Sequence, residues 1–275
     1  MKTQEERLNY LIEVLKNENS QYKNFETPAS IKDKKVMLRS LMNIRPPKET
    51  SAEILKIQDE YLTERAKEKC IVYLKDIKTI KENINSKNPY SQKISVWQGD
   101  ITKLSCDAIV NAANSQMLGC FVPMHTCIDN CIHTFAGVQL RYECNKIMNE
   151  FRKKYGGDYE QPTAIPIITD GYNLPAKKVI HITGPIVTTK LTTELENDLA
   201  NCYKNILDMC LKNNLKSVAF CCISTGVFNF PNEKAAEIAV ETVTNWLKQN
   251  GNKIDRIIFN VFKQEDNTLY EKLLQ

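Results

Sequence analysis

Between Val110 and Arg141 the sequence reads VNAANSQMLGCFVPMHTCIDNCIHTFAGVQLR, and this stretch decides how the chain is expected to fold. Its first residues continue a buried strand that begins near residue 108, and a helix is predicted from about residue 129 onward. The loop between them brings Cys120, His125 and Cys127 close together in the chain. Loops that join a strand to a helix are where α/β proteins place ligands, and two thiols with one imidazole are a familiar ligand set for zinc. The stretch therefore predicts a metal site in a strand-to-helix loop.

The rest of the chain from residue 91 onward alternates between strand and helix patterns. Strands are expected at 94–97, 107–111, 163–168, 178–182, 216–223 and 256–261. The stretch 129–154 is expected to be mostly helix, and further helices are expected at 194–213, 232–249 and 266–274. Such alternation indicates an α/β fold with a mainly parallel sheet sandwiched by helices. We take residues 91–275 as one domain.

Residues 1–90 have a different pattern, with amphipathic helices predicted at 1–17, at 31–44 and from residue 50 to about 72. Thr50, followed three residues later by Glu53, suggests a capping box for the third helix. The segment carries few apolar residues, so we expect it to lack a rich core of its own and to pack on the main domain. It is interpreted as a helical N-terminal extension.

Composition excludes several classes of protein. The N-terminus does not resemble a secretion signal, no apolar run approaches the ~20 residues of a membrane helix, and a cytoplasmic location is expected. Residues 1–90 hold 18 basic and 14 acidic side chains, which gives the whole net charge of +4, and this mild excess favours neither nucleic acid nor membrane as a partner. Because no secretion signal is recognised, the cysteines are expected to be reduced thiols. Six of them are interpreted as small core residues: Cys106, Cys144, Cys202, Cys210, Cys221 and Cys222.

Polar residues follow the predicted strands at the points where α/β sheets bind ligands. Asp100 and Ile101 follow the first strand, and Asn114 follows the second. After the strand near 220 comes a loop with the small residues and the following helix of a phosphate cradle: Ser224, Thr225, Gly226, Val227 and Phe228. An ordinary tight connection between strand and helix explains that loop equally well.

Five motifs occur in one order along the second part of the chain. They are GDIT at 99–102, VNAAN at 110–114, DNCIHTFAG at 129–137, GYNLPAKKVIHITGP at 171–185 and ISTGVFNFP at 223–231. Together they resemble the macrodomain family, from about residue 94 to the C-terminus. The resemblance implies a three-layer α/β/α fold with a mixed, mainly parallel central sheet that binds ADP-ribose. Many macrodomains hydrolyse ADP-ribose esters or related linkages.

The chain departs from most macrodomains between its asparagine motif and the following helix, where a glycine-rich run is usual. The replacement at 119–127 resembles the zinc-dependent subfamily of protein-ADP-ribose hydrolases, in which a Cys, a His and a Cys at this spacing hold the metal. LMNIRPP at 41–47 and KIQDEYL at 56–62 are similar to the extension that precedes the macrodomain there. This resemblance covers nearly the whole chain. It implies one zinc per chain and a functional pairing with a sirtuin-type ADP-ribosyltransferase, whose modification the protein would reverse.

The resemblance also implies roles for individual residues. Asp100 would accept a hydrogen bond from the adenine amino group, with a further contact from the Ile101 backbone, although the Gly-Asp pair also suits a plain turn. The amide of Asn114 suits ribose hydroxyls. The loop 224–228 would bind the diphosphate. Asp129 would orient or deprotonate the attacking water, or it could only cap the helix.

Three protein ligands leave the fourth tetrahedral position of a zinc ion open, which is typical of catalytic sites. Cys131 could close that position. The metal could activate a water or grip the distal ribose, and the sequence leaves both roles open. His133 and His181 are interpreted as core histidines, and Asn111 could be structural.

The sequence thus predicts a zinc-dependent hydrolase that removes mono-ADP-ribose from a modified protein side chain by cleavage at the anomeric carbon of the distal ribose. The alternative is a reader module that binds ADP-ribose without turnover and carries a structural zinc. The two hypotheses share Asp100, Asn114 and the loop 224–228, and they differ in whether the metal site takes part in the reaction.

Overall fold

The computed structural model describes residues 2–275, which form two compact units. The first unit contains the chain up to Cys70, Gln116–Tyr159 and Gly171–Leu174. The second contains Ile71–Ser115, Glu160–Asp170 and Pro175–Gln275. Each unit combines segments from separate parts of the chain, so the two units do not test the division into 1–90 and 91–275. That division stays a prediction.

The first unit is helical. Its N-terminal helices are α1 (Gln4–Asn17), α2 (Ile31–Ile44) and α3 (Ala52–Glu68). They bury a larger core than the sequence led us to expect, made of Leu8, Leu11, Ile12, Leu15, Leu38, Leu41, Met42, Ile57, Tyr61 and Leu62 together with Val138. Amphipathic stripes of this kind stabilise helices mainly through packing. The extension therefore has its own core, and α2 and α3 also contact α5 (Ile128–Ala136).

The mostly helical stretch expected at 129–154 is confirmed, and it consists of two helices, α5 and α6 (Val138–Tyr155). Gly137 separates the two helices with a φ of 102°, a backbone conformation that glycine adopts without strain. A Cβ at this position would also overlap the side chains of Gln58 and Gln139. The break depends on a single residue, which helical periodicity does not reveal.

The third helix also begins and ends differently from the expectation. Its N-cap is Ser51, whose hydroxyl accepts a hydrogen bond from Ile54 N at 3.4 Å, so the capping box on Thr50 is wrong. Thr50 instead accepts a bond from the Arg45 guanidinium. After α3 come a short strand β1 (Val72–Tyr73), a 3-10 turn (Leu74–Asp76) and α4 (Ile80–Ile84).

The second unit is built on a six-stranded sheet with the order β2-β8-β7-β4-β6-β5. Its strands are β2 (Ile94–Gln98), β4 (Ala108–Ala112), β5 (Ile167–Asp170), β6 (Lys178–Ile182), β7 (Ser217–Phe220) and β8 (Arg256–Val261). All neighbours are parallel except β5, which pairs antiparallel with β6. A short strand β3 (Leu104–Ser105) pairs with β1. The mixed, mainly parallel sheet is confirmed, although β5 lies later in the chain than the expected 163–168.

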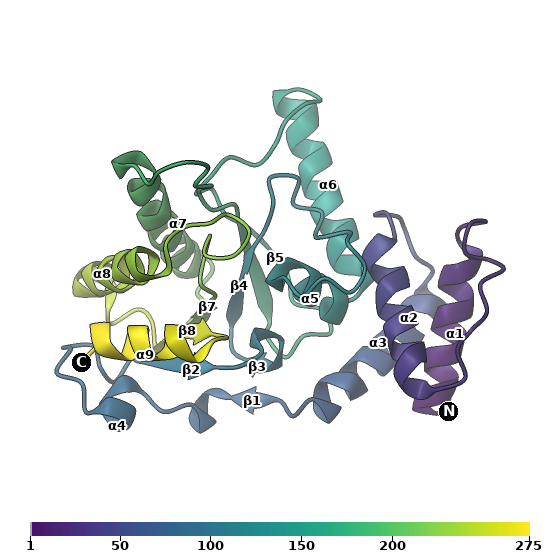
Figure 1. Cartoon of the computed structure of the whole chain (residues 1–275), viewed down its shortest axis with the longest axis horizontal. Coiled ribbons are helices and arrows are strands. Elements are labelled where there is room, and N and C mark those ends of the chain that lie inside the picture. The colour runs from purple at the N-terminus through teal and green to yellow at the C-terminus, as the bar shows by residue number, and fades with distance from the viewer. Residues whose placement is uncertain (1) are drawn as a thin grey trace. The chain divides into compact units, whose positions relative to one another are not determined.

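Three helices pack in succession on this sheet: α7 (Thr193–Lys212), α8 (Asn232–Asn250) and α9 (Gln264–Leu273) (Figure 1). α7 contacts β6, and α9 contacts β2 and β8. The architecture is the α/β class that the sequence predicts, with helices at the N-terminus, and it is consistent with a three-layer α/β/α fold. No helix within residues 2–275 has the length and apolar character to cross a membrane.

Because β2, β4, β6 and β7 run in parallel, their carboxyl ends meet at one edge of the sheet. Ligands of such sheets bind at that edge. Asp100 follows β2, Asn114 follows β4, and the loop 224–228 follows β7. The fold of the second unit therefore collects these three sequence motifs at the carboxyl edge.

Candidate metal centre and ADP-ribose site

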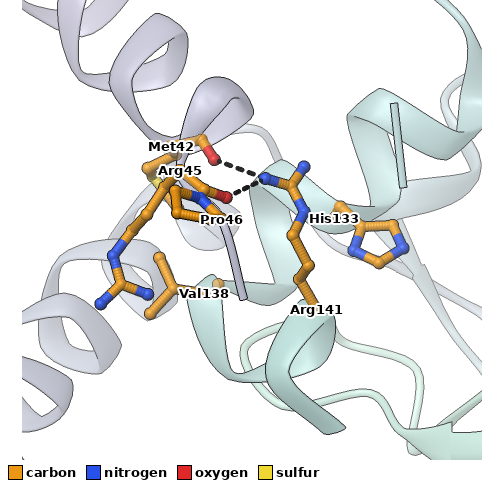
Figure 2. A pocket seen from close by; sticks show the side chains of 7 residues that line it. Met42, Arg45, Pro46, His133, Val138 and Arg141 are labelled. Atoms are coloured by element: carbon orange, nitrogen blue, oxygen red, sulfur yellow. Dashed lines mark hydrogen bonds between the residues drawn. The ribbon is translucent and has the colours of Figure 1, made fainter. Parts of the chain in front are cut away.

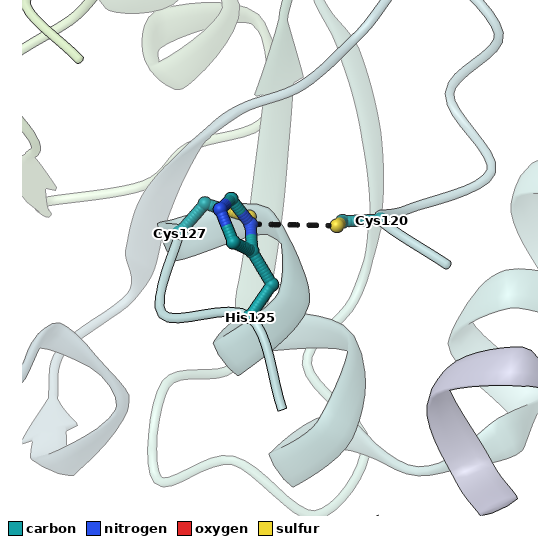
Figure 3. A group of neighbouring side chains, drawn as sticks. All are labelled: Cys120, His125 and Cys127. Atoms are coloured by element: carbon teal, nitrogen blue, oxygen red, sulfur yellow. Dashed lines mark hydrogen bonds between the residues drawn. The ribbon is translucent and has the colours of Figure 1, made fainter. Parts of the chain in front are cut away.

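Cys120, His125 and Cys127 converge in the first unit, as the sequence predicts (Figure 3). Their ligand atoms all lie within 4.8 Å of one another, and Cys120 Sγ lies 3.6 Å from His125 Nδ1. Around a tetrahedral zinc ion, with Zn–S near 2.3 Å and Zn–N near 2.0–2.1 Å, a sulfur and a nitrogen ligand are about 3.6 Å apart. The loop can therefore hold a metal ion with little movement of its ligands.

Burial and nearby negative groups both act on the Cys127 thiol. Burial, with the nearby Cys120 and Asp129 adding negative charge, raises the pKa of Cys127 to about 12. A cation among these groups offsets the repulsion and favours the thiolate form, since metal ligands bind deprotonated. The donor set and its charge both fit a divalent metal such as zinc.

Cys127 has a second function, because it is the N-cap of α5. Its Sγ accepts a hydrogen bond from Asn130 N at 3.4 Å. The possibility that Asp129 only caps the helix is therefore wrong. Asp129 lies within the first turn, is 5% exposed, and has its Oδ1 3.5 Å from His133 Nε2. A carboxylate at this position is stabilised by the helix dipole.

Cys131 does not join the cluster. Its Sγ lies 3.6 Å from Arg39 Nη2 and 4.0 Å from the Thr126 carbonyl oxygen. Among residues 2–275, the group that contains the loop thiols has three members, so one position of a tetrahedral metal is left for another ligand. Closure of the site by Cys131 is not supported.

No motif or spacing in the sequence singles out Arg141, which lies beside the metal loop. Its Nη1 donates to the carbonyl oxygens of Met42 and Arg45 at 3.2 and 2.6 Å (Figure 2). It also donates to that of Asn43 at 2.7 Å, so it caps the C-terminus of α2. Its Nη2 lies 3.4 Å from the Cys120 carbonyl oxygen. Burial lowers its pKa to about 10, although Asp129 and Cys120 oppose that shift.

The enclosed pocket around Arg141 has a volume of about 10 Å³ and is lined in part by Pro46, His133 and Val138 (Figure 2). A cavity of that size holds roughly one water molecule. It is far too small for a nucleotide, and we interpret the residues that line it as structural support for the metal loop.

In the second unit, Asp100 ends the turn after β2. Its Oδ1 accepts hydrogen bonds from Thr102 N at 2.9 Å and Thr102 Oγ1 at 2.6 Å, which caps the 3-10 turn Ile101–Lys103. Asn260 fixes the same turn by donating to the Gly99 carbonyl oxygen at 2.9 Å. The turn function suggested by the Gly-Asp pair is therefore present. A role at adenine is compatible with it, because each carboxylate oxygen can accept more than one bond.

Asn111 is fully buried in β4, and its Nδ2 lies 3.0 Å from His181 Nδ1. The other ring nitrogen of His181 lies 2.9 Å from Thr169 Oγ1. Burial lowers the pKa of His181 to about 3, so the ring is neutral at ordinary pH. Both residues are structural, as expected for His181, and they fix the end of the strand that leads to the half-buried Asn114.

The loop 224–228 has the form of an anion cradle. Ser224 has a φ of 65°, and its buried Oγ has no hydrogen-bond partner within residues 2–275. The amides of Gly226, Val227 and Phe228 likewise make no hydrogen bond within the described part of the chain, and Val227 is 75% exposed. Bonds from Asn229 N and Phe230 N to carbonyl oxygens of Gly226 and Ser224 hold the turn closed. Unpaired amides before a helix N-terminus favour an anionic ligand.

Gly184, after β6, contacts this loop closely. A Cβ there would overlap Ser224 Oγ and approach Ile223 Cγ2 to 2.8 Å. The Gly-Pro pair of the motif at 171–185 thus lets two loops of the second unit pack against each other.

The thiols outside the metal loop agree with their expected structural role. Cys106, Cys144, Cys202, Cys210 and Cys221 are buried cysteines outside any disulfide, and Cys222 is partly buried. Burial raises the pKa of each of these side chains, so they are neutral and packed in the interior.

Comparison with known proteins identifies relatives of this chain. The family model of the Macro domain matches residues 110–239. A protein-ADP-ribose hydrolase of Treponema medium is 50% identical over 272 residues, which cover 99% of this chain and 99% of that protein. A protein-ADP-ribose hydrolase of Staphylococcus aureus (strain MRSA252) is 42% identical over 99% of this chain and 96% of its own length.

The same family appears among solved structures. A Trypanosoma brucei macrodomain in complex with ADP-ribose superimposes with a TM-score of 0.64 at 27% identity, over 86% of this chain and 95% of that one. The relatives match along almost the whole chain, helical extension included. This chain therefore belongs to the macrodomain family of protein-ADP-ribose hydrolases.

Proposed function

We propose that this chain is a zinc-dependent hydrolase that removes mono-ADP-ribose from modified protein side chains, with cleavage at the anomeric carbon of the distal ribose. The observation that carries the proposal is the convergence of Cys120, His125 and Cys127 with a spacing that fits a tetrahedral metal and leaves one position open. The names of the relatives, protein-ADP-ribose hydrolases, support the hydrolytic part.

Cys120 and Cys127 would hold one zinc ion per chain as thiolates, and His125 would hold it through Nδ1, the nitrogen that faces the Cys120 sulfur. A zinc ion with three protein ligands supplies Lewis-acid chemistry through its fourth position. Cys127 also fixes the start of α5 and so sets the direction of the side chains in its first turn.

Asp129 is the residue of that turn to which we assign the proton transfer. It is buried, and a carboxylate within reach of the attacking water can accept its proton. Asn114 would hold hydroxyls of the distal ribose, because one amide can donate and accept at once.

The remainder of the ligand would be bound by the carboxyl edge of the sheet. Asp100 would accept from the adenine amino group, and the Ile101 backbone would add a contact. The loop Ser224, Thr225, Gly226, Val227 and Phe228 would bind the diphosphate through its free amides, those of Gly226, Val227 and Phe228, with Phe228 shielding the ribose. The unpartnered Ser224 Oγ supports this assignment, since a buried hydroxyl without a partner is costly unless a ligand completes it.

The partner would be an ADP-ribosylated protein, and ADP-ribose would be the product. Pairing with a sirtuin-type ADP-ribosyltransferase follows from the subfamily resemblance of the loop 119–127. We include that pairing in the proposal as the source of the modification.

Metal analysis combined with turnover tests the proposal. The purified protein should contain about one zinc per chain and release ADP-ribose from a protein modified on an acidic side chain. Chelation should abolish turnover, and added zinc should restore it. Full turnover by the metal-free protein would contradict a catalytic zinc. Binding of ADP-ribose without any turnover would favour the reader module instead.

A further inference from the structure

The metal loop receives two hydrogen bonds from α2, a helix that lies more than eighty residues earlier in the chain. Arg39 Nη2 donates to the carbonyl oxygen of His125 at 2.8 Å. Asn43 Oδ1 accepts from Met124 N at 3.0 Å. The two residues therefore hold the backbone of a metal ligand and of the residue before it.

Asn130 connects these contacts to the other end of the loop. It is fully buried in the first turn of α5, and its Oδ1 accepts from Arg39 Nη2 at 2.9 Å. Its Nδ2 donates to the Val122 carbonyl oxygen at 2.9 Å and lies 3.4 Å from that of Cys120. Its backbone N–H donates to Cys127 Sγ. Arg39 and Asn130 thus reach the loop at each of its three metal ligands.

The loop has little backbone structure of its own. Within residues 120–126, the bond from His125 N to the Val122 carbonyl oxygen is the one backbone–backbone hydrogen bond in the described part of the chain. Met124 has a φ of 58°, which is unfavourable for a residue with a side chain. Its N–H is the group that Asn43 binds, so α2 holds the loop at its most strained point.

Asn43 is itself fixed. It is 1% exposed, and its Nδ2 donates to Thr134 Oγ1 at 2.9 Å, while Thr134 Oγ1 donates to the Asn130 carbonyl oxygen at 2.7 Å. A buried polar side chain that is hydrogen-bonded at both its donor and its acceptor atom rigidifies its surroundings. These bonds connect α2, the metal loop and the first turns of α5.

We propose that Arg39 and Asn43 are positioning residues for the metal site, and that the N-terminal helices serve to preorganise the Cys120, His125 and Cys127 ligands. This inference rests on the proposed zinc function. It assigns the extension to the chemistry of the enzyme instead of to recognition of the modified protein. Groups that orient metal ligands from behind typically change metal affinity by about 10–100-fold when removed.

Arg39→Met is the main test, because it keeps the aliphatic stem and removes the donors. Arg7→Met is the matched control: Arg7 lies in the same helical segment and pairs with Glu60 of α3. Zinc affinity is measured by competition with a chromophoric chelator. Hydrogen–deuterium exchange of residues 120–127 is measured in the metal-free protein.

We expect R39M to bind zinc about 10–100-fold more weakly and to exchange faster across 120–127. R7M should match the wild type in both, and ADP-ribose affinity of the metal-free protein should be the same in all three. Asn43→Ala provides an independent second variant and should behave like R39M.

Unchanged zinc affinity together with unchanged exchange in R39M and N43A would overturn the positioning role. A wild-type protein that binds no zinc would instead overturn the proposed function. In that case the exchange measurement, made without metal, still decides whether α2 orders the loop.

Discussion

Cys127 belongs to the metal cluster and also caps α5, so two substitutions of this residue separate metal binding from helix capping. Serine keeps a side-chain acceptor for the Asn130 N–H, whereas alanine removes it. Both substitutions delete the thiolate that zinc would use. We expect C127S and C127A to lose zinc and turnover alike, but to differ in the stability of the metal-free protein.

The size of that difference follows from the cap. Loss of an N-cap acceptor costs about 1 kcal/mol, within a range of roughly 0.5–2 kcal/mol. Cys127 Sγ accepts at 3.4 Å, and a thiol is a weak acceptor, so serine should equal or exceed it. Metal-free C127A should therefore unfold with a free energy about 1 kcal/mol below that of metal-free C127S. For domains of about this size, the change corresponds to roughly 2–4 °C in Tm.

Urea unfolding of chelator-treated proteins measures the stability difference, and metal analysis with an ADP-ribose release assay measures the other two properties. Cys70→Ala is the control, since Cys70 is an exposed cysteine outside the cluster. Retention of zinc at wild-type affinity by C127S would refute the assignment of Cys127 as a ligand. Equal stabilities of metal-free C127S and C127A would refute the capping role.

Four further predictions concern single residues. Asp129→Asn should keep zinc while lowering kcat by about 10²–10⁴-fold, the range of general acid–base catalysis, and an unaltered kcat would remove Asp129 from proton transfer. Asp100→Ala should weaken ADP-ribose binding by about 1.5–3 kcal/mol in calorimetry, and unchanged affinity would argue against the adenine contact. Gly184→Ala should displace Ser224 and lower ADP-ribose affinity without loss of zinc, which the same calorimetry and metal analysis would check. Because the pKa of His181 is lowered to about 3, the unfolded chain binds a proton below about pH 6.5 that the folded chain does not. The free energy of unfolding of the metal-free protein should therefore fall as the pH drops from about 6.5 toward 3, with a smaller slope in H181N.

The local pattern of the sequence was enough to predict most of the regular structure. α2 spans the predicted 31–44, and β6 spans the predicted 178–182. Periodicity reports which face of an element is buried, and that depends on nearby residues alone. The bounds of β5 were wrong, because its pairing with β6 sets where the strand begins and ends. The break at Gly137 was not predicted, because it depends on the backbone conformation of one glycine.

The metal ligands were also predictable, because Cys120, His125 and Cys127 lie within one short loop and their side-chain chemistry is distinctive. The residues that support the loop were not. Arg39, Asn43 and Arg141 form hydrogen bonds to backbone atoms of the loop or of α2 across 81 to 99 positions of the sequence. Every residue has a backbone carbonyl, so residue identity does not show which of them accepts a hydrogen bond from a distant side chain.

The sequence by itself thus determined the α/β class, the motifs of the ligand-binding edge and the donor atoms for a metal. Only the tertiary structure decided that Cys127 caps α5, that Cys131 lies outside the cluster, and which buried side chains hold the loop. The donor atoms of the metal ligands and the periodicity of helices and strands depend on residues that are close together in the sequence. The orientation of a metal ligand depends on hydrogen bonds that form only when distant helices have packed.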